Sequence, residues 1–89
     1  MLFACWSPER GETYDDDAKC LDTGWPGQAA ARFAERHAGF NGDPFDYLIV
    51  HVAEVDDQRN IVGKIRVFEV EVRAEPTFWA SEMQEGGAR

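Results

Sequence analysis

The apolar run from Tyr47 to Val55 constrains the fold more than any other segment of the chain. It reads Tyr-Leu-Ile-Val-His-Val-Ala-Glu-Val and is rich in β-branched and aromatic residues. Successive side chains of a strand point to opposite faces of the sheet, so a run that is apolar at consecutive positions predicts a strand covered on both faces. We therefore expect Tyr47–Val55 to lie at a central position in a sheet.

The clearest helix of the sequence precedes this strand and spans residues 28–38. Four of its side chains fall at positions i, i+3, i+4 and i+7, which places them on one face of a helix. Pro26 suits the first helical position, and Gly39 suits a left-handed residue after the helix end. The pattern predicts an amphipathic helix that packs its stripe against a sheet. The stripe consists of Ala30, Phe33, Ala34 and His37.

The N-terminal part of the chain predicts a hairpin. Leu2–Trp6 is apolar and aromatic and suits a strand, and residues 7–11 contain the Pro and Gly of a turn. We expect the chain to return antiparallel over residues 13–21, with Tyr14, Ala18 and Cys20 on one face. The acidic run Asp15-Asp16-Asp17 weakens this second strand, which favours an edge position or a bulge.

The last long strand is expected over Ile61–Ala74, after a turn at residues 56–60. Its alternation changes phase between Val67 and Phe68, which predicts a bulge there. Pro76 ends the strand, and we interpret residues 77–89 as a short tail after a single domain of residues 1–76. The expected fold is α+β, a four-stranded antiparallel sheet with one helix packed on one face, in the order ββαββ.

Charge restricts the classes of partner. Nine Lys and Arg stand against seventeen Asp and Glu, which gives a net charge of -8. Phosphate backbones and anionic membranes repel such a chain, whereas a basic protein surface attracts it. No apolar run approaches the roughly 18 residues of a membrane span, and we expect a cytoplasmic protein.

Cysteine and histidine spacings do not indicate a metal centre. Cys5, Cys20, His37 and His51 are separated by 15, 17 and 14 residues, without the close pairs that zinc sites use. Cys5 and Cys20 lie equally far from the predicted turn and are expected to face each other across the hairpin. A disulfide and two reduced thiols both fit this register, and a cytosolic location favours the thiols.

Other reactive patterns are absent from the sequence. Ser7 and Ser81 lack the glycines of a nucleophile elbow, and Gly24 and Gly27 lack the rest of a phosphate-binding loop. The acidic groups do not follow the calcium-loop spacing. We therefore expect no cofactor, no bound metal and no enzymatic activity.

The order of features resembles that of a class of small proteins. A short strand leads into Glu9-Arg10-Gly11-Glu12, an Asp-rich return contains Asp17-Ala18, and a helix reads Gln-Ala-Ala-Ala-Arg-Phe-Ala-Glu over residues 28–35. This arrangement, from Leu2 to Val72, resembles small acidic accessory proteins of phages and mobile elements, including anti-CRISPR proteins of type I systems. The resemblance implies a non-enzymatic inhibitor that occupies a nucleic-acid-binding surface of a CRISPR effector complex, in the host cytosol if phage-encoded.

The leading hypothesis is thus an acidic protein that blocks a basic partner without binding nucleic acid or membrane. Its carboxylates would stand in for phosphates, and aromatic side chains would anchor the contact. The alternative is a homo-oligomeric structural or assembly protein, such as a homodimer, that hides a sheet face and the Phe-Trp tail. An enzyme or metal protein is the third hypothesis. The candidate binding residues are Asp15, Asp16, Asp17, Asp22, Asp56, Asp57, Glu69, Glu71, Tyr14, Trp25, Phe78 and Trp79.

Overall fold

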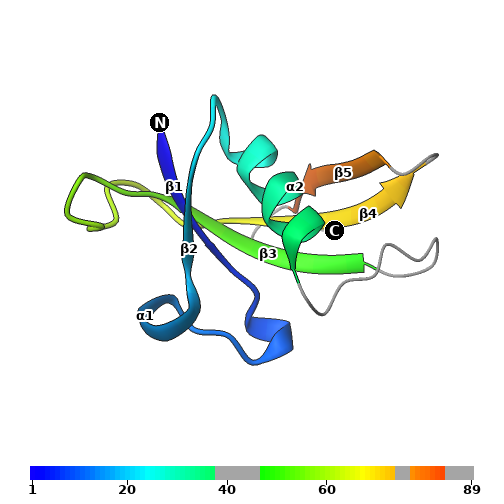
Figure 1. The fold of residues 1–89 in the computed structure, drawn as a ribbon, viewed down its shortest axis with the longest axis horizontal. Helices are drawn as coiled ribbons and strands as arrows, with labels where there is room; N and C mark the ends of the chain where they lie inside the picture. Colours follow the sequence, from blue (N-terminus) through cyan, green and yellow to red (C-terminus); the bar gives the residue numbers. More distant parts are fainter. Residues whose placement is uncertain (38–46, 74–76, 84–89) are drawn as a thin grey trace.

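The computed structural model describes residues 1–37, 47–73 and 77–83, which form one antiparallel sheet and three helical segments. Figure 1 shows helix α2 lying across the sheet and the small segments η1 and α1 at one end of it. In chain order the elements are β1 (Leu2–Trp6), the 3-10 turn η1 (Pro8–Arg10), α1 (Tyr14–Asp17), β2 (Lys19–Asp22), α2 (Pro26–Arg36), β3 (Tyr47–Glu54), β4 (Arg66–Arg73) and β5 (Thr77–Glu82).

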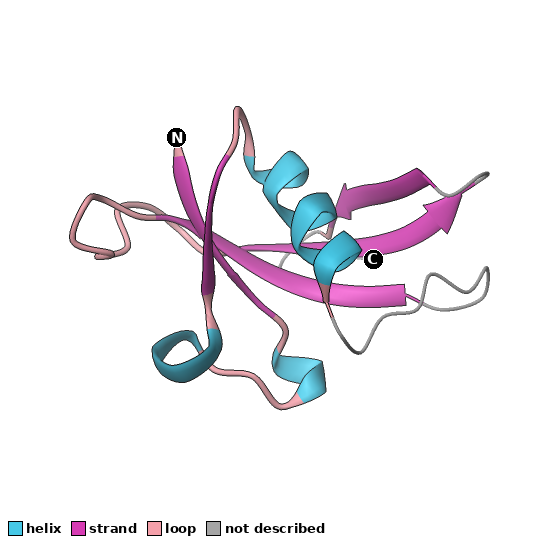
Figure 2. Cartoon of the chain, viewed as in Figure 1, coloured by secondary structure: helices cyan, strands magenta, loops and turns pink. Residues whose placement is uncertain are grey.

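The sheet has the strand order β2-β1-β3-β4-β5, and each pair of neighbours is antiparallel. The central position predicted for the apolar run is confirmed, because β3 lies between β1 and β4. The α+β class is also confirmed, and Figure 2 shows its strands and helices. The expectation of four strands is wrong by one. Thr77–Glu82, expected as a tail, pairs with β4 as a fifth strand, with Phe78 opposite Val72.

Helix α2 and the sheet enclose the main core. Its Ala29, Ala30, Phe33 and Ala34 are buried, so the predicted stripe is confirmed for the interior of the helix. Two small alanines side by side let the helix backbone approach the strands closely. Leu48, Val50 and Val52 of β3 face it, and the contributions from the other strands are Phe3, Cys5, Phe68 and Val70, with Leu21, Phe78 and Ala80 at the margin.

The opposite face of the sheet has a smaller apolar cluster at the β1–β3 end. Trp6 lies at its centre beside Ala4 and Ala53, and Tyr14 of α1 packs on it from outside. The Trp6 and Tyr14 rings meet edge to face with centroids 5.2 Å apart. Ser7 closes this end, since its buried hydroxyl donates to the Ile49 carbonyl at 2.7 Å.

Two local expectations for the strands are wrong. Residues 14–17 form a helical turn instead of strand, because Thr13 caps it and three aspartates fill its first turn, where the helix dipole favours negative charge. The strand proper is reduced to Lys19–Asp22, at the predicted sheet edge. No bulge separates Val67 from Phe68 either, since they pair in unbroken register with His51 and Val50. Strand β4 begins only at Arg66.

The predicted helix-ending Gly39 lies outside the described residues. Within the described part of the chain, no helix has the length and apolar character needed to cross a membrane.

Candidate functional site

The acidic run 15–17 is held in place by its own capping hydrogen bonds. Thr13 begins α1, and its hydroxyl accepts from the Asp16 amide at 3.2 Å, while the Thr13 amide donates to the Asp17 carboxylate at 3.0 Å. These reciprocal bonds satisfy amide groups that the helix start would otherwise leave unpaired. They use the Asp17 carboxylate and leave Asp15 and Asp16 exposed at the surface.

Tyr14 brings α1 next to the loop between β3 and β4. Its ring packs on Trp6, and its hydroxyl donates to the Arg59 carbonyl. In this loop Asp56 accepts from the amides of Gln58 and Asn60, both at 2.9 Å. The backbone hydrogen bond from Asn60 is the main reason that the pKa of Asp56 is lowered, so its charge persists to lower pH.

Tyr14 thus links α1 to this loop. We call the aspartates of the two linked segments the acidic end: Asp15, Asp16, Asp17, Asp56 and Asp57. Asp57 is exposed, as are Asp15 and Asp16. None of these three carboxylates has a hydrogen bond or ion pair within the described parts of the chain. Arg59 adds one positive charge in the same loop. Figure 1 shows the loop projecting beyond the sheet on the side where α1 lies.

The structure does not bring the other candidate residues to this surface. Asp22 lies at the opposite end of β2, where its carboxylate meets the N-terminal amino group at 3.0 Å. Glu69 and Glu71 are half-buried on β4. Phe78 packs against the main core. The side chain of Trp79 lies outside the described residues. Of the twelve candidates, five are the aspartates of the acidic end, and a sixth, Tyr14, links its two segments.

Trp25 is an exposed aromatic residue at a different place, the start of helix α2. Its side chain has 56% exposure and lies over Gly27, where an added Cβ would come within 2.0 Å of the indole ring. The absence of a side chain at Gly27 thus provides the space for this ring. Trp25 remains a candidate anchor, but it belongs to the N-terminal end of α2.

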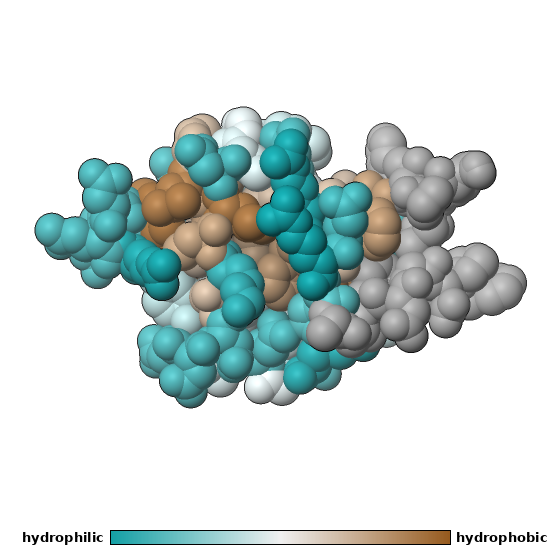
Figure 3. Space-filling model, viewed as in Figure 1, coloured by the Kyte–Doolittle hydropathy of each residue, from teal (hydrophilic) through white to brown (hydrophobic). Residues whose placement is uncertain are grey.

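A second exposed apolar area precedes β4. Ile61, Val62 and Ile65 are all partly exposed, Val62 by 53%. Figure 3 shows apolar surface next to the projecting β3–β4 loop, on the face that carries α2. The alternation of this segment predicted a strand, but only an isolated bridge joins Ile61 to Val55. Its apolar side chains consequently remain outside the core.

Cysteine and histidine side chains are distributed over both faces of the sheet. Cys5 pairs with Lys19 and faces the main core, whereas Cys20 pairs with Ala4 and belongs to the smaller cluster. The expected facing register is therefore wrong, and both thiols are free. Among the described residues, no three His, Cys, Asp or Glu side chains are grouped to hold a metal ion.

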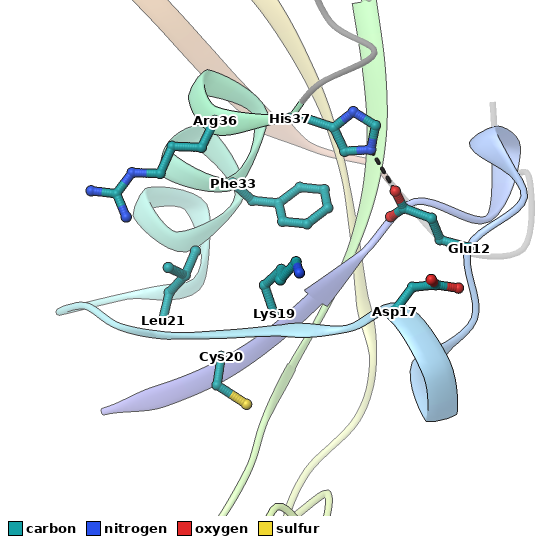
Figure 4. Close-up of a pocket in the computed structure, with 8 residues that line it drawn as sticks. All are labelled: Glu12, Asp17, Lys19, Cys20, Leu21, Phe33, Arg36 and His37. Carbon is teal, nitrogen blue, oxygen red and sulfur yellow. Dashed lines mark hydrogen bonds and ion pairs between the residues drawn. The ribbon is translucent and has the colours of Figure 1, made fainter.

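Sequence reasoning missed a pocket between the C-terminal half of α2 and the edge strand β2. It has a volume of about 510 Å³. Glu12 and His37 form one wall, with Oε2 and Nε2 2.6 Å apart, and Figure 4 shows this pair facing the pocket. The remaining lining residues are Asp17, Lys19, Cys20, Leu21, Phe33 and Arg36. No spacing rule relates a turn glutamate to a histidine 25 positions later, so the sequence contained no signal for this pair.

Comparisons of the chain with protein-family models, with curated proteins and with solved structures find no match.

Proposed function

We propose that the protein is a non-enzymatic binding module whose acidic end docks on the basic surface of a nucleic-acid-binding protein and blocks it. The observation that carries the proposal is the group of exposed carboxylates, Asp15, Asp16 and Asp57, on a chain of net charge -8. Such a field accelerates the encounter with Arg- and Lys-rich grooves. In its most specific form, the partner is a type I CRISPR effector complex and the protein is a phage-encoded inhibitor.

The rigidity of the acidic end supports this proposal. Capping bonds fix the short helix, Tyr14 ties it to the β3–β4 loop, and Asp56 fixes the turn of that loop. Carboxylates on a backbone held in this way lose less conformational entropy on binding than carboxylates on a flexible tail. The acidic end can thus present its exposed carboxylates from a fixed backbone.

The test measures whether the protein competes with DNA for a basic partner. A purified type I effector complex is titrated with labelled target DNA in the presence and absence of the protein, at 50 and 300 mM NaCl. We expect inhibition at low salt that weakens as salt increases, because the contact is electrostatic. Uninhibited DNA binding would reject the CRISPR form of the proposal. A pull-down from host extract, eluted with DNA, then tests the general form.

A pair of matched variants assigns the contact to the acidic end. Asp15→Asn with Asp57→Asn removes two charges there, and Glu9→Gln with Glu35→Gln removes two from exposed positions elsewhere. The first double variant is expected to bind about tenfold more weakly, as two charge contacts of the surface type imply. Equal weakening by both variants would show that net charge alone acts, and would contradict a defined docking surface.

Self-association is the second candidate function, and the exposed apolar area at Ile61, Val62 and Ile65 favours it. Contiguous apolar surface of this kind often marks a protein contact. Sedimentation velocity at about 10 and 200 μM protein, compared with the Val62→Ser variant, measures it. A concentration-dependent dimer that the variant abolishes supports this function, and a monomer at both concentrations rejects it.

A further inference from the structure

We infer that the pocket between α2 and β2 binds a small organic anion with an apolar body. The inference is independent of the proposed docking function, because the pocket shares only Asp17 with the acidic end. Its volume of about 510 Å³ is within the range of small-molecule sites.

The floor of the pocket is apolar. Phe33 projects from helix α2 and Leu21 from strand β2, and both side chains line the gap between helix and sheet edge (Figure 4). Phe33 has a relative exposure of 5%, and it is one of the residues that line the pocket. The Cys20 thiol points to the other side of β2 (Figure 4) and adds no reactive group to the cavity. A flat apolar ligand would therefore find a surface to pack on.

The carboxylates of the pocket are already committed to internal donors. Glu12 accepts from the Ser7 amide at 2.9 Å through one oxygen and meets His37 through the other. Asp17 accepts from the Thr13 amide. A ligand cation would have to compete with these contacts. The donors to Glu12 and Asp17 also offset part of the negative charge of these carboxylates, which weakens their repulsion of a ligand anion.

The pocket also contains two cations, Lys19 and Arg36. Lys19 and Arg36 make no hydrogen bond or ion pair within the described parts of the chain. Figure 4 shows Lys19 pointing into the space below Phe33, while Arg36 extends along the margin on the helix side. In a chain with a net charge of -8, two cations next to an apolar floor favour an anionic group over a neutral one.

The chemical class follows from these contacts: a carboxylate or similar anionic group near Lys19, attached to a flat apolar body on Phe33 and Leu21. Indole-3-acetate is a suitable probe, because it carries both parts. Indole-3-acetamide keeps the body without the charge, and acetate keeps the charge without the body. Titrations of the full-length, isotope-labelled chain followed by amide NMR locate and quantify each interaction.

We expect indole-3-acetate to bind with a Kd on the order of 1 mM, as a ligand of this size can achieve. The shifted amides should be those of residues 19–21 and 33–37. The amide and acetate should each bind at least about tenfold more weakly. Equal binding of the amide and the acid would overturn the inference, as would shifts centred on other surfaces such as residues 61–65.

Variants separate the pocket from general charge effects. Lys19→Gln combined with Arg36→Gln should weaken indole-3-acetate about tenfold, since each removes one exposed ionic contact. Arg32→Gln removes a positive charge from an exposed position of the same helix outside the pocket and should leave the Kd within a factor of two. Equal weakening by Arg32→Gln would contradict a localised site. The Asp15→Asn, Asp57→Asn variant should still bind indole-3-acetate. A failure of the pocket proposal can therefore be told apart from a failure of the docking proposal.

Discussion

At the scale of single residues, the two cysteines show how strongly a one-position shift of register acts on a hairpin. Placing Cys5 opposite Cys20 required a symmetric turn, but α1 takes up residues 14–17 and moves the pairing to Cys5 with Lys19. Because side chains alternate between faces, the thiols point to opposite sides of the sheet. Burial raises the pKa of Cys5 to about 12, and the charge of Cys20 contributes in the same direction.

These environments predict unequal thiol reactivity. At pH 8, Cys20 is expected to react with an aromatic disulfide reagent within minutes, because it is only half-buried. Cys5 is expected to stay protected, because the thiolate is the attacking species and the raised pKa keeps this thiol protonated. The measurement is the number of aromatic thiols that the reagent releases per protein chain, in native buffer and in 6 M guanidinium, with Cys20→Ser as the control. Rapid release of two aromatic thiols per chain in native buffer would contradict the buried position of Cys5.

His51 predicts a loss of stability in mild acid. Burial lowers its pKa, and the nearby charge of Glu9 opposes this effect in part. The unfolded chain therefore takes up the proton at a higher pH than the folded chain does, so His51 contributes stability above its ordinary pKa that is lost as the pH falls through the folded pKa. Urea unfolding at pH 7 and pH 5 should show a smaller loss for His51→Gln than for the native protein. An equal loss in both would exclude this residue as the cause.

At the scale of elements, β5 shows which parts of the fold the sequence could predict. The central strand follows from its nearly continuous apolar run, because both of its faces are covered. The helix stripe follows from its periodicity, because only one face of the helix is buried. Residues 77–82 have no such pattern, and Phe78 and Ala80 read equally well as a tail folded on the core. The pairing with β4 is between neighbouring segments, from Arg73 opposite Thr77 to Phe68 opposite Glu82, and it was missed because Pro76 was interpreted as the end of the sheet. The pocket was missed for another reason, since its two sides come from elements separated in the sequence.

The fifth strand predicts a contrast between two substitutions. Phe78→Ala should lower the free energy of unfolding by about 2 kcal/mol, because the ring is half-buried against the main core. Glu82→Gln removes the exposed ion pair with Arg66, in which the shortest contact is 2.9 Å, and should cost less than about 1 kcal/mol. Urea unfolding curves measure both. Similar small values for the two variants would mean that β5 contributes little to the stability of the sheet.

At the scale of the whole molecule, the excess negative charge opposes folding. The body extends 36 × 30 × 26 Å, which is close to the Debye length of about 30 Å at 0.01 M salt and well above the about 8 Å at 0.15 M. At low salt each carboxylate therefore interacts with most of the others, whereas near 0.15 M it interacts only with its neighbours. Asp15 and Asp16 are neighbours in α1, so part of this repulsion remains even when distant charges are screened.

This repulsion predicts that added salt stabilises the protein. Between 10 and 150 mM NaCl, the free energy of unfolding should rise by on the order of 0.5–1 kcal/mol, because screening weakens repulsion over the whole body. The double variant Asp15→Asn, Asp57→Asn should start more stable at 10 mM and gain less from salt, while Glu35→Gln should follow the native curve more closely. Urea unfolding followed by tryptophan fluorescence gives the values. A fall in stability with salt would mean that attractive pairs such as Arg66–Glu82 outweigh the repulsion. The carboxylates of the acidic end would then already be compensated within the fold, and they would attract a basic partner too weakly to act as its docking surface.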